Sequence, residues 1–153
     1  MSEMKKVVTN EQTRNIFAFF MFGILLKLPT EITATATADI LAGSSIATGA
    51  ATVTKGIANA LCIITLPWFL QKLSFSTKVA LIIGLYVAGF ITIATADSAI
   101  VRLIGLCIAE IGRGESTMTV FSTTAFYSDP SISAVAAGTG VGTVLGTLYY
   151  TGK

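Results

Sequence analysis

The stretch from Val101 to Tyr127 is apolar over a length that can cross a bilayer, yet it contains Glu110, Arg113 and Glu115. A charge near the centre of a bilayer costs about 2.5 to 3.5 kcal/mol on insertion scales. Three such charges in one span must therefore face protein or water rather than lipid. This stretch limits the fold more than any other, because the rest of the chain must supply those polar surroundings.

Helix geometry divides the three charged residues into a pair and a single residue. Glu110 and Arg113 are three residues apart and lie on one side of a helix, which predicts an internal ion pair. Glu115 lies roughly 140° from Glu110 around the helix axis and is left without a partner. An ionisable group inside a membrane span is a functional candidate, so we expect Glu115 to handle a proton or a substrate. In the alternative, the span ends near Cys107 and the charges lie at the membrane surface.

The apolar run from Met118 to Phe126 favours the intramembrane interpretation, because it completes a span of about 20 residues or more. Composition supports a membrane protein: 53% of the residues are hydrophobic and 12% are charged, with a mean hydropathy of +0.78, against about 25% charged residues in an average soluble domain. We predict an all-α, polytopic membrane protein.

The same composition excludes several classes of function. The net charge is only +2 and no basic cluster occurs, so we expect no nucleic-acid partner. The chain has no histidine, which removes the usual catalytic bases and zinc ligands. Cys62 and Cys107 each lie in an apolar run, where a buried free thiol is the usual state. Glu110 and Glu115 could form an acid–base pair, but no nucleophile accompanies them. We expect no catalytic residue, metal or cofactor, and no enzyme.

The hydropathy pattern predicts a polar segment at residues 1–14 and a transmembrane domain at 15–153. Thr9 and Gln12 have the form of a capping box, which predicts a helix start there. Pro29 predicts a kink in the first helix. We expect about five transmembrane helices, with spans at about 15–41, 50–70, 79–96, 100–126 and 132–150.

Loop charges give an orientation. Lysines and an arginine precede the first span, and two lysines lie near the connection between the second and third spans. The positive-inside rule then predicts a cytosolic amino terminus. The residues are Lys5, Lys6, Arg14, Lys72 and Lys78.

Polar side chains at helical spacing predict the wall of a cavity. The second half of the first span is rich in threonine and too polar for lipid, and the second span carries a mixed face. Lys55 on that face either snorkels from near a helix end or lies in the cavity. The candidates are Thr33, Thr35, Thr37, Lys55, Asn59, and, one and two turns after Glu115, Thr119 and Ser122.

The last span contains Gly138, Gly142 and Gly146 at four-residue spacing, with Gly140 between them. Small residues at this spacing let two membrane helices approach closely, so we expect all four glycines to pack against another helix. A dinucleotide-binding loop is rejected, because no strand–helix–strand unit surrounds the glycines.

Several segments together resemble the battenin family of lysosomal and vacuolar membrane proteins, which are related to major facilitator transporters. The resemblance covers nearly the whole chain from Asn15. It rests on NIFAFFMFG, Ala38 to Leu41, Pro67, Gly112-x-Gly114-Glu115, Thr124 to Tyr127, Gly138-Thr139-Gly140, Gly146 and Tyr150. It implies that Glu115 is the acidic residue of the fourth helix.

The resemblance also implies an architecture and a function. We expect an incomplete amino-terminal bundle of a major-facilitator-like transporter, which needs the lipid bilayer and a second bundle or partner chain to move an unknown small molecule. The implied location is a lysosomal, vacuolar or endosomal membrane, and the implied roles are in pH and in transport of basic amino acids or small metabolites. The alternative is a small membrane scaffold or assembly protein, whose glycine face recruits a partner and which transports nothing by itself.

Overall fold

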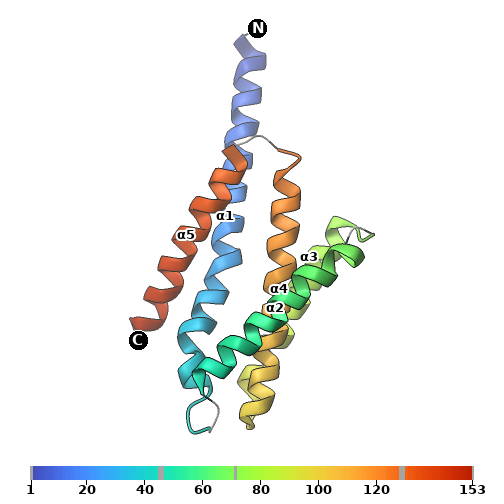
Figure 1. Cartoon of the computed structure of the whole chain (residues 1–153). Coiled ribbons are helices and arrows are strands. Elements are labelled where there is room, and N and C mark those ends of the chain that lie inside the picture. The colour runs from blue at the N-terminus through green and yellow to red at the C-terminus, as the bar shows by residue number, and fades with distance from the viewer. Residues whose placement is uncertain (1, 45–46, 71, 128–129, 153) are drawn as a thin grey trace. The chain divides into compact units, whose positions relative to one another are not determined.

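A computed structural model of the chain describes the backbone of residues 2–44, 47–70, 72–127 and 130–152. In these ranges it contains helices and turns and no strand, so the predicted all-α class is confirmed. The helices are α1 (Ser2–Ile40), α2 (Thr48–Leu70), α3 (Phe75–Thr95), α4 (Ala99–Thr124) and α5 (Pro130–Thr151), shown in Figure 1. Each helix overlaps one of the five segments that the sequence predicted as spans.

Four segments of these helices are long and apolar enough to cross a membrane: Glu11–Ile40, Thr48–Phe69, Phe75–Thr95 and Pro130–Thr151. The remaining helix, α4, is 26 residues long but carries four charged side chains, and it does not belong to this set. Helix α4 as a structural element is therefore established, whereas its passage through the membrane stays a prediction.

Helix α1 differs from the prediction at its start. It begins at Ser2 and continues to Ile40, so the helix start predicted at the capping box of Thr9 and Gln12 is wrong. The polar segment 1–14 is rich in Lys, Glu and Met, which favour helix in water as well as next to a membrane. Pro29 lies inside α1 and does not end it.

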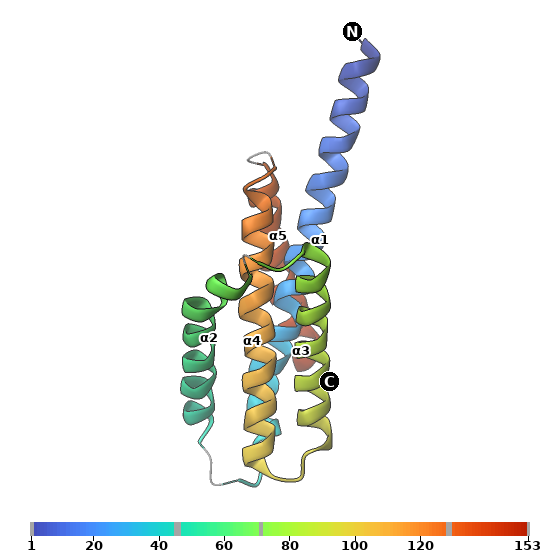
Figure 2. The same cartoon turned by 90° about the vertical axis from the view of Figure 1, so that its right-hand side faces the viewer.

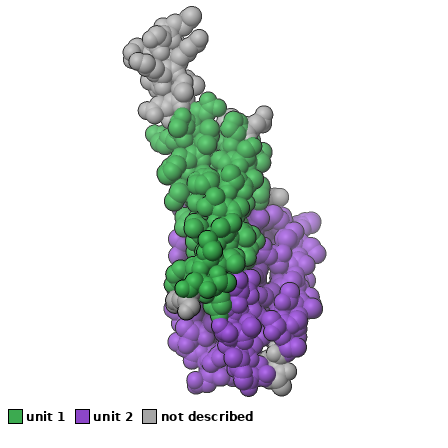
Figure 3. All heavy atoms as spheres, turned by 90° about the vertical axis from the view of Figure 1, so that its left-hand side faces the viewer, with its two compact units in different colours: residues 1–32, 120–153 green, residues 33–119 purple. Residues whose placement is uncertain are grey.

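The chain forms two compact units, coloured separately in Figure 3. Unit 1 contains residues 1–32 and 120–153, and unit 2 contains residues 33–119. Helices α1 and α4 each contribute residues to both units.

In unit 1, helix α5 packs against α1 through glycines. A side chain at Gly142 would lie 2.9 Å from the carbonyl oxygen of Ile24, and one at Gly146 would lie 2.7 Å from Cβ of Glu31. A side chain at Gly138 would collide with the carbonyl oxygen of Phe20. Only glycine allows the two backbones to come so close, so the glycine spacing of α5 determines which face meets α1.

Gly140 corrects one part of the packing prediction. A side chain at Gly140 would meet open space within the part of the chain that the structure describes, so this glycine does not pack against α1. The reason is angular: Gly140 is two residues from both Gly138 and Gly142 and therefore points to another side of α5.

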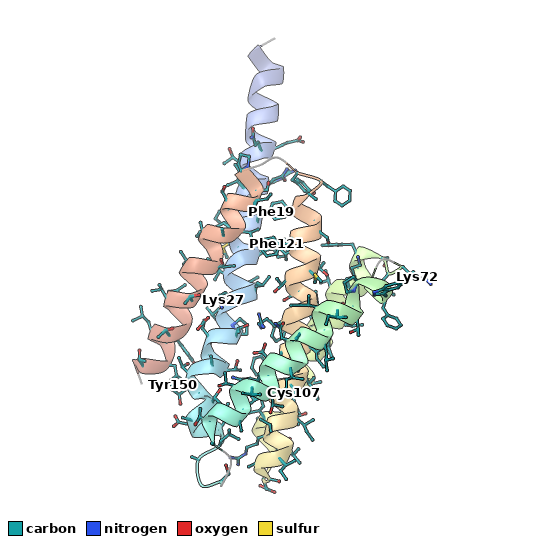
Figure 4. The ribbon with its side chains drawn as sticks, viewed as in Figure 1. Phe19, Lys27, Lys72, Cys107, Phe121 and Tyr150 are labelled. Atoms are coloured by element: carbon teal, nitrogen blue, oxygen red, sulfur yellow. The ribbon has the colours of Figure 1, made fainter. Side chains whose placement is uncertain are left out.

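A small cluster of side chains completes the interior of unit 1. Phe19, Ala134 and Val135 are buried together, and the rings of Phe19 and Tyr127 lie edge to face with centroids 5.0 Å apart. Phe19 is labelled in Figure 4. Burial of the aromatic ring and the close glycine contacts hold α1 and α5 side by side.

In unit 2, helix α4 has close neighbours on two sides. Towards α3, a side chain at Gly89 would lie 2.9 Å from the carbonyl oxygen of Gly105 and 2.9 Å from the backbone nitrogen of Ala109. Figure 2 shows α3 and α4 running alongside each other. Towards α2, a side chain at Gly114 of α4 would lie 2.9 Å from Sγ of Cys62. Small residues on α4 thus let both neighbours pack against it.

Candidate functional site

Glu115 is fully buried in the structure, with no exposed surface. Neither of its carboxylate oxygens has a hydrogen-bond partner among the described residues. It interacts electrostatically with Lys78 of α3 and with Cys62 of α2. A buried polar group in a folded protein is normally hydrogen-bonded, so a buried carboxyl group without a partner points to a functional role.

Glycines close to this position make its burial possible. One residue before Glu115, a side chain at Gly114 would lie 2.9 Å from Sγ of Cys62. Three residues before it, a side chain at Gly112 would lie 3.1 Å from Cβ of Leu85. Helices α2 and α3 therefore both contact α4 in the turn that carries Glu115.

The ion pair on α4 has the geometry that its spacing predicts. Nε of Arg113 donates to Oε2 of Glu110 at 2.6 Å. The side chains are 25% and 11% exposed, so the pair is only partly shielded. Glu115 takes no part in this bond, in keeping with its different position around the helix.

Two of the predicted cavity residues meet where α1 approaches α2. Nζ of Lys55 donates to Oγ1 of Thr37 at 3.0 Å, and the Thr37 hydroxyl donates to the carbonyl of Thr33 at 2.6 Å. Lys55 is half-buried, whereas Thr33 and Thr37 are buried. The lysine thus lies against a hydroxyl group of a neighbouring helix.

The other candidates are distributed along α1, α2 and α4. Asn59 lies next to Gly114, with its Oδ1 atom 3.4 Å from a side-chain position there. Thr119 is buried on α4, and Ser122 is exposed and belongs to unit 1. Thr35 is half-buried on α1. Their role as a cavity wall stays a prediction.

Some positions next to the site were not predicted from the sequence. Gly89, Gly105 and Ala109 bring α3 to α4, and Cys62 donates from Sγ to the carbonyl of Ile111 at 3.4 Å. On α4, Ala109 follows Gly105 by four residues and Gly112 follows Ala109 by three. This spacing of small residues resembles that of the α5 glycines, but it was identified from the sequence only in α5. In unit 1, Gly23 of α1 lies against Gly138 of α5, and a side chain at Gly23 would collide with the carbonyl oxygen of Val135.

A comparison with protein families finds a match to the family described as "CLN3 protein", over residues 17–152. Curated relatives agree with it. The chain is 24% identical to Protein BTN1 of Chaetomium globosum, over 97% of this chain and 33% of that protein. It is 29% identical to Protein BTN1 of Debaryomyces hansenii, over 91% of this chain and 34% of that protein.

An animal protein is similar as well. The chain is 33% identical to Battenin of Canis lupus familiaris, over 71% of this chain and 25% of that protein. The chain therefore spans about a third or less of the length of these relatives. No solved structure matches the chain.

Proposed function

Because this chain belongs to the CLN3 protein family, we propose that it is the amino-terminal part of a battenin-like transporter of lysosomal or vacuolar membranes. The apolar helices support insertion in a bilayer. The relatives are about three times as long or longer, which is consistent with a transporter in which a second bundle completes the pathway. In this proposal α4 crosses the membrane with the others and the amino terminus is cytosolic.

The observation that supports transport most strongly is the buried, unbonded carboxyl group of Glu115. An isolated ionised carboxylate is much more costly to bury than a neutral carboxyl group. In our proposal Glu115 is neutral while it is buried, and it releases its proton when the helices around it move and water or substrate reaches it. Each cycle then couples proton release to substrate movement.

Several polar groups of unit 2 fit the wall of a substrate pathway. Lys55, Asn59 and Thr37 offer an ammonium group, an amide and a hydroxyl in the same unit as Glu115. We propose that they contact a small polar solute, such as a basic amino acid or another small metabolite, and that its export influences the pH of the compartment. The protein performs no covalent chemistry in this proposal.

The alternative of a scaffold that recruits a partner through the glycines of α5 has less support. That glycine surface is already covered by α1 within unit 1. Gly138, Gly142 and Gly146 would have to leave α1 to bind another protein, which makes recruitment through them less favourable.

The proposal is tested with vesicles from lysosomal or vacuolar membranes that contain the protein, loaded with radiolabelled arginine and with their interior acidified. Glu115→Gln keeps the size of the side chain and removes its titration, so it should reduce efflux to the level of membranes without the protein. Glu11→Gln changes an exposed carboxylate at the start of the first span and should have no effect. If efflux and its pH dependence both survive in Glu115→Gln, the assigned role is wrong.

A further inference from the structure

Two glycines in the motif Gly112-x-Gly114-Glu115 make contacts with two different helices. A side chain at Gly114 would lie 2.9 Å from Sγ and 3.3 Å from Cβ of Cys62, on α2. A side chain at Gly112 would lie 3.1 Å from Cβ of Leu85 and 3.5 Å from the backbone nitrogen of Tyr86, on α3. The turn of α4 next to Glu115 therefore has a neighbouring helix on each of two sides.

Close contacts occur at some glycines of unit 2 and not at others. Gly89 and Gly105 pack α3 against α4 at another level, whereas a side chain at Gly56 of α2 or at Gly84 of α3 would meet no atom within 4 Å among the residues described. Gly112 and Gly114 are the close glycines nearest in the sequence to Glu115, whose carboxyl group is completely buried. The uncrowded glycines on the same neighbouring helices provide matched controls.

We infer that Gly112 and Gly114 are positioning residues that close α3 and α2 over the carboxyl group of Glu115 and keep water from it. The inference rests on the proposed function for its consequence in transport, because a carboxyl group that carries a proton across a membrane must be sealed from water in at least one state. The sealing itself is a matter of packing and can be measured without any substrate.

The contact at Gly114 has little freedom to adapt. Cys62 is buried, and its Sγ atom donates to the carbonyl of Ile111 on α4. A methyl group at position 114 would therefore displace the thiol from this hydrogen bond or push α2 away from α4. The displaced thiol would no longer hold α2 to α4, and a displaced α2 would leave a gap, so we expect water to reach the position one residue from Glu115. Removal of the thiol in Cys62→Ala leaves space for the methyl group and should restore the seal.

The test measures access of water-soluble reagents to Glu115 in the full chain. A water-soluble carbodiimide with an added amine modifies carboxyl groups that water reaches, whereas dicyclohexylcarbodiimide also reaches carboxyl groups in apolar surroundings. The extent of modification at Glu115 is determined by mass spectrometry of the peptide that contains it. We expect dicyclohexylcarbodiimide alone to modify the parent protein at this residue.

Gly114→Ala should increase modification by the water-soluble reagent several-fold, and Cys62→Ala/Gly114→Ala should return it to the parent level. Gly56→Ala and Gly84→Ala should leave it unchanged. If Gly114→Ala does not fold, as judged by its elution on size exclusion, Gly112→Ala provides the milder test at a contact of 3.1 Å. Modification at the parent level in a folded Gly114→Ala or Gly112→Ala protein overturns the inference.

The two proposals can fail separately. If Glu115→Gln transports like the parent while the glycine variants admit the water-soluble reagent, the seal exists and proton coupling at Glu115 is wrong. If Glu115→Gln abolishes efflux while the glycine variants stay closed to the reagent, proton coupling stands and the positioning role of Gly112 and Gly114 is wrong.

Discussion

Nη1 of Arg102 on α4 donates to the carbonyl oxygen of Ile40, the last residue of α1, at 3.0 Å. Its Nε atom donates to the carbonyl oxygen of Ala96, at the end of α3, at 2.9 Å. The last carbonyl groups of a helix have no partner within the helix. One guanidinium group thus donates a hydrogen bond to a carbonyl group at the carboxyl end of each of two helices in unit 2. These bonds hold the first residues of α4 next to both helix ends.

We predict that Arg102→Gln lowers the free energy of unfolding by about 1–3 kcal/mol, because it leaves partly buried carbonyl groups without their donors. Arg102→Lys should restore part of the loss, since an ammonium group lacks the planar fork that reaches two carbonyls. Thermal unfolding in detergent measures both effects. Lys72→Gln, at an exposed position, is the control and should change stability by no more than about 0.5 kcal/mol. Equal stability of Arg102→Gln and Lys72→Gln would contradict the role of Arg102.

The ion pair on α4 gives a second prediction. Glu110→Gln leaves the guanidinium group of Arg113 without its carboxylate, so we expect the free energy of unfolding to fall by about 1–3 kcal/mol. Removal of both charges in Glu110→Gln/Arg113→Gln should cost less than the single substitution, because no unpaired charge remains. Thermal unfolding of the three proteins provides the comparison. A double variant that is less stable than Glu110→Gln argues against this account.

Substitutions at two glycines of α5 test the contact between α1 and α5. Gly138→Ala places a methyl group against the carbonyl oxygen of Phe20, and backbone atoms cannot rotate away, so we expect a loss of about 1–3 kcal/mol in unfolding free energy. Gly140→Ala faces open space and should be neutral or slightly stabilising, since alanine favours helix. Similar melting temperatures for both variants would show that α5 does not pack against α1 in this way.

Passage of α4 through the membrane is the prediction that composition supports least. Ser98 precedes α4 and Ala125 follows it, and both are exposed. In a protein with Cys62 and Cys107 replaced by alanine, Ser98→Cys should react with a membrane-impermeant maleimide only from the lumenal side, and Ala125→Cys only from the cytosolic side. Reaction of both cysteines from the same side would exclude a membrane crossing by α4.

Much of the fold could be predicted from the sequence, because long apolar runs separated by polar turns specify membrane helices. The bounds of α2 and α5 agree with the predicted spans to within two residues. The predicted start of α1 was wrong because the sequence pattern of a capping box can also occur inside a helix. The sequence also suggested helix packing at Gly140, whereas its angular position on α5 turns it away from α1.

The site was predictable only in part. The cost of charge together with the angular position on the helix singled out Glu115, and a three-residue spacing indicated the bond between Glu110 and Arg113. The contacts of Lys55 with Thr37 and of Arg102 with Ile40 join residues far apart in the chain, and no local pattern specifies such pairs. The seal around Glu115 also depends on which helices flank α4, which only the three-dimensional structure gives.

The central claim is that the carboxyl group of Glu115 binds and releases a proton. Infrared difference spectroscopy of the protein in membranes, between acidic and neutral pH, measures this directly through the carbonyl stretching band of a protonated carboxyl group. The account predicts a component of this band that is present in the parent protein and in Glu11→Gln and absent in Glu115→Gln. A band that persists unchanged in Glu115→Gln would contradict the claim, because another group would then carry the proton.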